Sequence, residues 1–362
     1  MPMVENIVET AGRRVIFVKC RPQDADIVDI VRSEQRVFIG YPPWRRGALY
    51  DRANMASCLV NLGSAGDGWK NEIKDYYPAM ATNRGFALSV GKGWIVAIPR
   101  PGKGVCWLAE IVGGFELIDN PPWAARYLEF RREKGLPCSD EDEFSHVGDV
   151  VQSWPCSSPI AVPFGGIPRW ITYRLLSRPT IGEIRGFPKR ELNAHATLKR
   201  FIDGTPAPPL TDTDDVAEIQ RRLLTFVSPA TLEHLCVELL QLEHPDETWW
   251  HVGGAGDGGA DGLGYTHDWI PSGRVQCKWY FNGSRVSEVF NRPCENMRQV
   301  FASLIHGRVE QDVQGAEFWA LEHIAMLVKK HAKDLPIARS LRIAITFPTV
   351  GKYASSYGGS SC

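Results

Sequence analysis

The sequence lacks several features that would assign its class at once. Its nine cysteines form no Cys-x-x-Cys pair, the spacing typical of zinc ribbons and dithiol redox sites. We therefore expect buried, reduced thiols and not a disulfide or zinc framework. No uninterrupted apolar run approaches the roughly 18–20 residues of a membrane span, and the N-terminus shows no secretory pattern. The sequence predicts a cytoplasmic protein without a membrane partner.

An excess of charge of either sign is also missing. The 41 Lys and Arg residues nearly balance the 42 Asp and Glu residues, so any contact with nucleic acid must come from local clusters of cations. With 362 residues and 44% hydrophobic residues, the chain is long enough for two or three cored domains.

Residues 1–120 consist mainly of short alternating runs separated by Gly, Pro and Asn, a pattern that predicts a small β-barrel. The clearest element is a hairpin. Trp94, Val96 and Ile98 fall on one face of its first strand, residues 99–104 form its turn, and residues 105–111 form its return strand.

Residues 121–212 are rich in Pro, Arg and Trp, which predicts a bridging region without a core of its own. Residues 201–215 carry Pro and short polar side chains and form the best linker candidate. We therefore expect three parts, 1–120, 121–212 and 213–362, in a multidomain α+β or α/β protein.

Residues 213–362 alternate helical and strand-like patterns. Ser228 is a good N-cap before Pro229, and leucines then recur on one helical face, which predicts a helix over 229–243 after a first helix over 216–227. The remaining patterns predict a strand over 274–281, helices over 296–307 and 318–333, and a last strand over 341–348. This succession predicts an α/β core with a central mixed sheet.

A glycine-rich stretch precedes the strand over 274–281. Gly254, Gly256 and Gly259 match G-x-G-x-x-G, but further Gly and Pro residues prevent the helix that a dinucleotide site needs, and the Gly-Lys-Ser/Thr of a phosphate loop is absent. A β-hairpin of strands 260–265 and 274–281 fits better. Gln276 and Lys278 then share one face of the return strand.

These residues resemble the Mrr-like branch of the PD-(D/E)XK nucleases, a group of DNA-cleaving restriction endonucleases. The resemblance covers 217–350 and rests on the run from Gly256 to Asp261, on Gln276-Cys277-Lys278, and on the helix that carries Glu233. It implies that Asp261, Gln276 and Glu233 bind Mg²⁺ or Mn²⁺, and that Lys278 faces the attacked phosphate or the water. Oxygen ligands suit such cations, and an ammonium suits the developing negative charge.

Several assignments stay open at this site. Gln276 stands where most members have an acid, which lowers the negative charge and should weaken metal binding, so one ion or two are possible. Glu238 competes with Glu233 as the helical carboxylate, and Asp257 is typical of a turn residue. His251 and His267 flank the site, but neither receives a role.

The hairpin over 94–111 resembles the central hairpin of PUA-like barrels, which include modified-base readers. The resemblance implies a pocket that holds an extruded base between aromatic rings. The candidate walls are Trp44, Trp69, Tyr76, Trp94 and Trp107, although such residues also commonly fill a barrel core. The candidate phosphate contacts are Lys92, Arg100 and Lys103.

Together these patterns predict a divalent-metal-dependent endonuclease that cleaves double-stranded foreign DNA after recognising a modified base. The alternatives are a restriction endonuclease that reads an unmodified short site, a repair or recombination nuclease, and a non-cleaving reader of modified nucleic acid. Cleavage of both strands generally needs two active centres, so we expect a homodimer on DNA.

Overall fold

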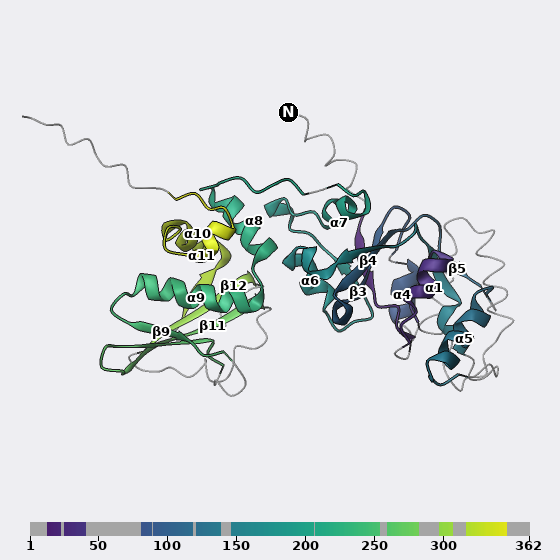
Figure 1. Ribbon diagram of the computed structural model, residues 1–362, viewed down its shortest axis with the longest axis horizontal. Helices are drawn as coiled ribbons and strands as arrows, with labels where there is room; N and C mark the ends of the chain where they lie inside the picture. Colours follow the sequence, from purple (N-terminus) through teal and green to yellow (C-terminus); the bar gives the residue numbers. More distant parts are fainter. Residues whose placement is uncertain are drawn as a thin grey trace, which may run out of the picture. The chain divides into compact units, whose positions relative to one another are not determined.

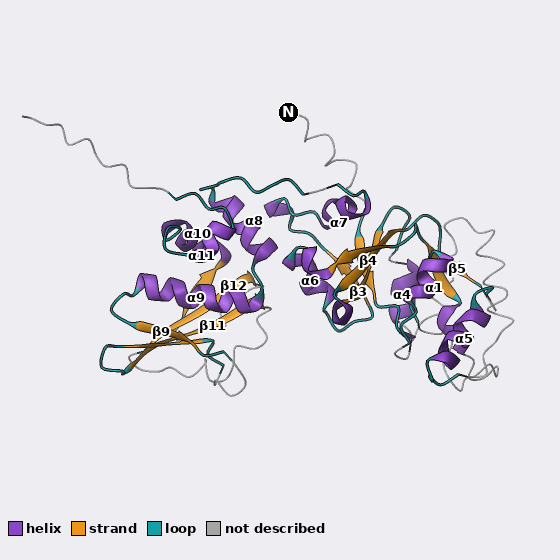
Figure 2. Ribbon diagram, viewed as in Figure 1, coloured by secondary structure: helices purple, strands orange, loops and turns teal. Residues whose placement is uncertain are grey.

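The computed structural model describes residues 13–22, 25–40, 81–88, 90–118, 121–138, 146–205, 207–253, 259–281, 297–306 and 316–345. The chain divides into two compact units, Met1–Pro208 and Pro209–Cys362 (Figure 1). Both units combine helices and strands (Figure 2), so the predicted α+β class is confirmed at this level. None of the described helices is both long and apolar enough to cross a bilayer.

The described strands of the first unit form two sheets. The five-stranded sheet has the order β7-β4-β3-β1-β8, and the three-stranded sheet has the order β2-β6-β5. The strands are β1 (Val15–Val18), β2 (Arg36–Phe38), β3 (Ile95–Arg100), β4 (Val105–Glu110), β5 (Glu116–Leu117), β6 (Gln152–Pro155), β7 (Ile160–Pro163) and β8 (Ile181–Ile184). The helices are α1 (Val28–Glu34), α4 (Ala81–Leu88), α5 (Ala124–Glu133), α6 (Arg169–Leu175) and α7 (Ala194–Ile202).

The predicted hairpin over 94–111 is confirmed. β3 and β4 pair antiparallel from Ile95↔Glu110 to Arg100↔Val105, and the turn at Pro101–Lys103 is a short 3₁₀ segment that ends at Gly104 with a φ of 66°. A glycine suits this position because a left-handed backbone costs it little. Local turn chemistry therefore determines this element.

The predicted barrel is not shown, because the two sheets do not close on each other within the described residues. β1 pairs parallel with β3 on one side and antiparallel with β8 on the other. β6, β7 and β8 all come from the segment 121–212, which was expected to bridge the domains but supplies strands to both sheets. Proline-rich composition did not reveal these long-range pairings.

The second unit contains one described sheet with the order β13-β12-β11-β10-β9. Its strands are β9 (Thr248–His251), β10 (Gly262–Tyr265), β11 (Pro271–Phe281), β12 (Arg298–His306) and β13 (Glu317–Ala320), and its helices are α8 (Val216–Phe226), α9 (Pro229–Glu243), α10 (Leu321–Lys330) and α11 (Pro336–Ser340). β11, β12 and β13 run parallel, whereas β9, β10 and β11 pair antiparallel. The predicted mixed sheet is confirmed.

The predicted helices over 216–227 and 229–243 are also confirmed as α8 and α9. The Oγ of Ser228 accepts a hydrogen bond from the backbone N–H of Thr231, and Pro229 occupies the first turn of α9, where its missing N–H costs nothing. The predicted helix over 318–333 is α10 preceded by the short strand β13. At the predicted last strand, Ile343 makes an isolated parallel bridge with Thr213.

The helix predicted over 296–307 is wrong, because this segment forms strand β12. It lies between β11 and β13, and its residues from Gln299 to Leu304 are buried. A strand covered on both faces reads as a continuous apolar run, which periodicity cannot distinguish from a buried helix.

Helix α9 packs on β9 and β11 (Figure 1), and glycines show which sheet face it covers. A Cβ added to Gly262 would lie 2.6 Å from a methyl carbon of Val237 on α9 and 2.8 Å from one of Val275. Val275, Cys277 and Trp279 therefore face α9. Gln276 and Lys278 lie on the opposite face, because side chains alternate along a strand.

Candidate functional site

The hairpin of β10 and β11 holds Asp261 against the backbone of β11. The backbone N–H of Asp261 donates to the carbonyl of Val275 at 2.8 Å, and its Oδ2 accepts from the N–H of Cys277 at 2.6 Å. The carboxylate therefore lies at the peptide group that joins Gln276 to Cys277. Hydrogen bonds from a backbone N–H favour the ionised form of such a carboxylate.

The Gln276 side chain is buried, with 2% of its surface exposed. Its Nε2 donates to the carbonyl of Gly259, the residue that closes the glycine-rich stretch, and this bond determines how the amide is oriented. Its Oε1 has no hydrogen-bond partner in the described part of the chain. A buried acceptor of this kind is costly unless something donates to it or binds it. The arrangement fits an oxygen-preferring divalent cation held by Asp261 and Gln276.

Lys278 follows two residues later and shares the face of Gln276. Its side chain is half-buried, and its position on β11 pairs with Ser303 of β12. Among the described residues we find no carboxylate within ion-pair distance of its ammonium. Gln276 and Lys278 thus share one face of β11, and the Asp261 carboxylate contacts the backbone N–H of Cys277 between them; that the three side chains form one site stays a prediction.

Glu233 lies on the other side of the sheet from Gln276. It belongs to α9, on the Cys277 side of the sheet, where its Oε2 lies 3.1 Å from Nε2 of His251. A Cβ on Gly253 would lie 3.1 Å from this Oε2 and from the His251 ring, so a glycine there lets the Glu233–His251 pair pass close to the backbone. The sequence led us to expect that Glu233 and Gln276 share one ion, but the strand alternation puts them on opposite faces. Within the described chain, no group of three His, Cys, Asp or Glu side chains could hold a metal ion.

Glu238, the competing helical carboxylate, points to solvent on α9. Partial desolvation raises the pKa of its carboxyl, against a smaller opposing effect of His234. An exposed acid with a raised pKa is a weaker cation ligand than Asp261. The structure therefore favours neither helical carboxylate as a partner of Gln276.

Cys277 lies beneath the site and stays protonated. A hydrogen bond with Cys236 on α9, together with burial, raises the pKa of its thiol well above the ordinary value, and the negative charges of Asp261 and Glu233 act in the same direction. A thiol in this state is inert, so Cys277 serves packing and not nucleophilic chemistry.

Sequence reasoning assigned no role to two residues of β9 that border this site. His251 pairs with Glu233 and stacks on His234 with ring centroids 4.0 Å apart. Its neighbour Trp250 is 52% exposed, which is unusual for so large an apolar side chain. The alternation in Thr248–His251 could have indicated one inward and one outward Trp, but not which of the two faces water.

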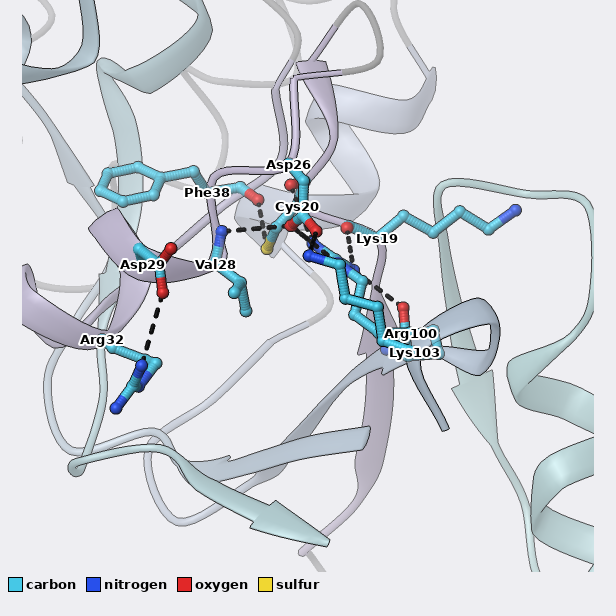
Figure 3. A network of polar contacts seen from close by, with 10 residues as sticks. Lys19, Cys20, Asp26, Val28, Asp29, Arg32, Phe38, Arg100 and Lys103 are labelled. Atoms are coloured by element: carbon cyan, nitrogen blue, oxygen red, sulfur yellow. Dashed lines mark hydrogen bonds and ion pairs between the residues drawn. The ribbon is translucent and has the colours of Figure 1, made fainter. Parts of the chain in front are cut away.

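In the first unit, Arg100 is turned inward (Figure 3). Its guanidinium donates to Oδ1 of Asp26 at 2.8 Å and to the carbonyls of Lys19 and Cys20 at 2.8 and 3.3 Å, and only 4% of it is exposed. These bonds use the donors that a phosphate contact would need. Arg100 was expected to bind phosphate, but its geometry is that of an internal clamp between β1, β3 and the chain before α1.

The other predicted contacts of the first unit have different surroundings. Lys103 is exposed and pairs with Oδ2 of Asp26 at 2.8 Å, while Lys92 is exposed in the turn before β3. Trp94 and Trp107 pack against the core, and the guanidinium groups of Arg14 and Arg32 lie over their rings. An arginine side chain therefore covers part of each ring. Trp44, Trp69, Tyr76 and Asp257 lie outside the described residues.

Comparison of the chain with protein-family models, with curated proteins and with solved structures gives no match.

Proposed function

We propose that this protein is a divalent-metal-dependent DNA endonuclease whose first unit selects the DNA that the second unit cuts. The observation that carries the proposal is the hydrogen bond from the N–H of Cys277 to the Asp261 carboxylate, at 2.6 Å. This bond holds the Asp261 carboxylate at the backbone N–H of Cys277. Cys277 stands between Gln276, whose amide is buried, and Lys278. A carboxylate, an amide oxygen and an ammonium are the groups that metal-assisted phosphodiester hydrolysis needs.

Each side chain has a separate task in this proposal. Asp261 and Gln276 are the cation ligands, and the unpartnered Oε1 of Gln276 supports that role. Mg²⁺ or Mn²⁺, when bound, supplies Lewis-acid polarisation of the phosphodiester and lowers the pKa of water. Lys278 stabilises the charge that builds on the phosphate oxygens.

Glu233 has an indirect task. Its contact with His251 at 3.1 Å keeps it on the α9 side, where its charge adds to the negative field beneath β11. We do not assign it to the ion held by Gln276. This narrows the proposed ligand set to Asp261 and Gln276, completed by water or DNA oxygens.

The proposal is tested by plasmid cleavage with the full-length protein in Mg²⁺ and in Mn²⁺. In Asp261→Asn, the amide oxygen still accepts from the N–H of Cys277 while the charge is removed, so the fold persists and cleavage falls by about 100-fold or more. Lys278→Met keeps the side-chain length and should cause a similar loss.

The matched control is Asp268→Asn, an exposed acid in the β10–β11 turn, which should cleave like the wild type. Full cleavage by Asp261→Asn and Lys278→Met, with far-UV circular dichroism unchanged, would end the nuclease proposal.

A further inference from the structure

An aromatic strip, defined here as Trp250, Tyr265 and Trp269, runs along the β9–β10–β11 hairpins. Trp250 is 52% exposed and Trp269 is 67% exposed. The rings of Tyr265 and Trp269 lie 6.2 Å apart at 52°. The proposed nuclease chemistry uses none of these residues, and exposed apolar side chains that lie together on one surface commonly mark a binding site.

The strip lies on the same face of the sheet as Gln276 and Lys278. Trp249 is on the α9 face, because its backbone N–H donates to Oε1 of Gln241 on α9 and its ring packs over Gly264 and Gly273. Its neighbour Trp250 therefore points the other way. In the sheet, Trp250 of β9 lies opposite Leu263 of β10, and Leu263 lies opposite Arg274 of β11. Arg274 comes two residues before Gln276.

This register makes the strip a close neighbour of the candidate cation site. Trp250 and Gln276 are separated by two strand spacings of about 4.8 Å and by two residues of about 3.3 Å, which together amount to about 12 Å. Tyr265 and Trp269 continue the same face towards the end of the hairpin. A chain bound at Gln276 and Lys278 could therefore continue directly onto the aromatic rings.

The backbone at the hairpin end holds Trp269 outward. Its φ is 60°, in the left-handed region that a bulky side chain rarely adopts. Such strain persists where the surrounding structure or a function requires it. Here the result is a large ring held in solvent beside Ile270, which is itself 60% exposed.

Charge determines which partner fits this surface. Lys278 adds an ammonium without a described carboxylate partner to the same face, and it complements a phosphate. A second copy of the chain would bring another Lys278 to this face. Aromatic rings stack on unpaired bases, whereas paired bases are already stacked inside a duplex.

Resting on the proposed nuclease function, we infer that the aromatic strip stacks unpaired bases next to the scissile phosphate. The substrate class is then DNA with single-stranded nucleotides at the cut, such as a fork, a bulge or a locally melted duplex. Trp250 is the ring nearest the cation site, and Trp269 extends the platform.

The test measures binding separately from cleavage. Full-length protein is titrated in EDTA against three fluorescein-labelled oligonucleotides of one sequence: a single strand, a fork with unpaired arms, and a blunt duplex. We expect Trp250→Ala to weaken binding of the single strand and the fork about tenfold, and of the duplex less than about twofold. Trp250→Phe, which keeps a ring, should bind nearly as the wild type does.

Two further variants complete the design. Met326→Ala removes an exposed apolar side chain of α10 and should change no affinity. Trp269→Ala provides a second probe of the strip if Trp250→Ala fails to fold, and it should also weaken single-strand binding selectively.

Three results would overturn the inference: no change in either Trp variant, equal losses on all three oligonucleotides, or wild-type protein that binds none of them. A wild-type dimer that Trp250→Ala dissociates in sedimentation would reassign the strip to self-association. If binding depends on Trp250 but Mg²⁺ and Mn²⁺ support no cleavage, the base-stacking role of the strip stands, while the nuclease proposal and the placement beside a scissile phosphate fail.

Discussion

At the scale of single residues, the amide of Gln276 limits how the proposed cation site can be built. Its Nε2 is engaged by Gly259, so only Oε1 can serve as a ligand. An acid at this position would bind a cation more tightly, but it would face the Gly259 carbonyl without a proton to donate. The glutamine thus suits a site that must be stable without metal.

An acid at position 276 would bind a cation more tightly but would fit the metal-free protein less well. We therefore expect the stability of Gln276→Glu to depend on metal. Without metal, the buried carboxylate opposes a carbonyl oxygen, and the free energy of unfolding should fall by about 1–3 kcal/mol. Added Mg²⁺ should restore most of the loss, because it binds the new charge in the native state only. Urea unfolding with and without Mg²⁺ measures both effects. Gln299→Glu, whose side chain meets Arg274, is the control and should show no such recovery.

The ion pairs of Asp26 should make the folding stability of the first unit depend on pH. Burial alone would raise the pKa of its carboxyl, but hydrogen bonds from Arg100 and Lys103 outweigh burial and lower the pKa to about 2. The carboxylate is therefore more acidic in the folded than in the unfolded chain. Its stabilisation, about 2 kcal/mol, is complete above pH 4 and is lost as the pH falls towards 2.

The measurement is urea unfolding across this pH range, followed by hydrogen exchange in peptides from β1 and β3. Asp26→Asn should flatten the fall in stability between pH 4 and pH 2. Asp29→Asn changes an exposed acid of α1 and should leave the fall unaltered. An Asp26→Asn profile parallel to the wild type would contradict the role of the clamp.

At the scale of elements, the start of α9 depends on one side chain. The Oγ of Ser228 accepts from the N–H of Thr231, which satisfies a donor that the helix leaves unpaired. Ser228→Ala should lower the unfolding free energy of the second unit by about 1 kcal/mol, whereas Ser228→Asn, another good cap, should stay close to the wild type. Chemical denaturation that finds the two variants equal would refute the capping role.

Elements with local determinants were predictable, and those with distant partners were not. Ser228 and Pro229 predict the start of α9, and turn residues predict the β3–β4 and β10–β11 hairpins. β12 carries no such signal, because its side chains from Gln299 to Leu304 are buried on both faces of the sheet and leave no exposed polar stripe. Its periodicity therefore could not decide between helix and strand.

At the scale of the whole molecule, two units with separate cores suit a division between selecting DNA and cutting it. The proposed selectivity predicts that cleavage differs among matched plasmids that are unmodified, 5-methylated, hydroxymethylated or glucosylated. A pocket that responds to one such group should change the rate about tenfold or more.

The control for this comparison is Asp261→Asn, which should cut none of the four plasmids and so excludes a contaminating nuclease. Equal rates on all four would remove the modification hypothesis while leaving the nuclease unit intact. An unmodified short site would then be the better explanation of the first unit.

The sequence by itself determined that the β10–β11 hairpin brings Asp261 to the part of β11 that carries Gln276 and Lys278, because a hairpin register and strand alternation are local properties. It also determined the N-terminal cap of α9 and the β3–β4 turn. Only the tertiary structure decided that Glu233 lies across the sheet, that Arg100 is buried on Asp26, and that Trp250 faces outward while Trp249 packs on α9. These outcomes depend on which face a distant helix or strand covers, and residues near in sequence do not encode that choice.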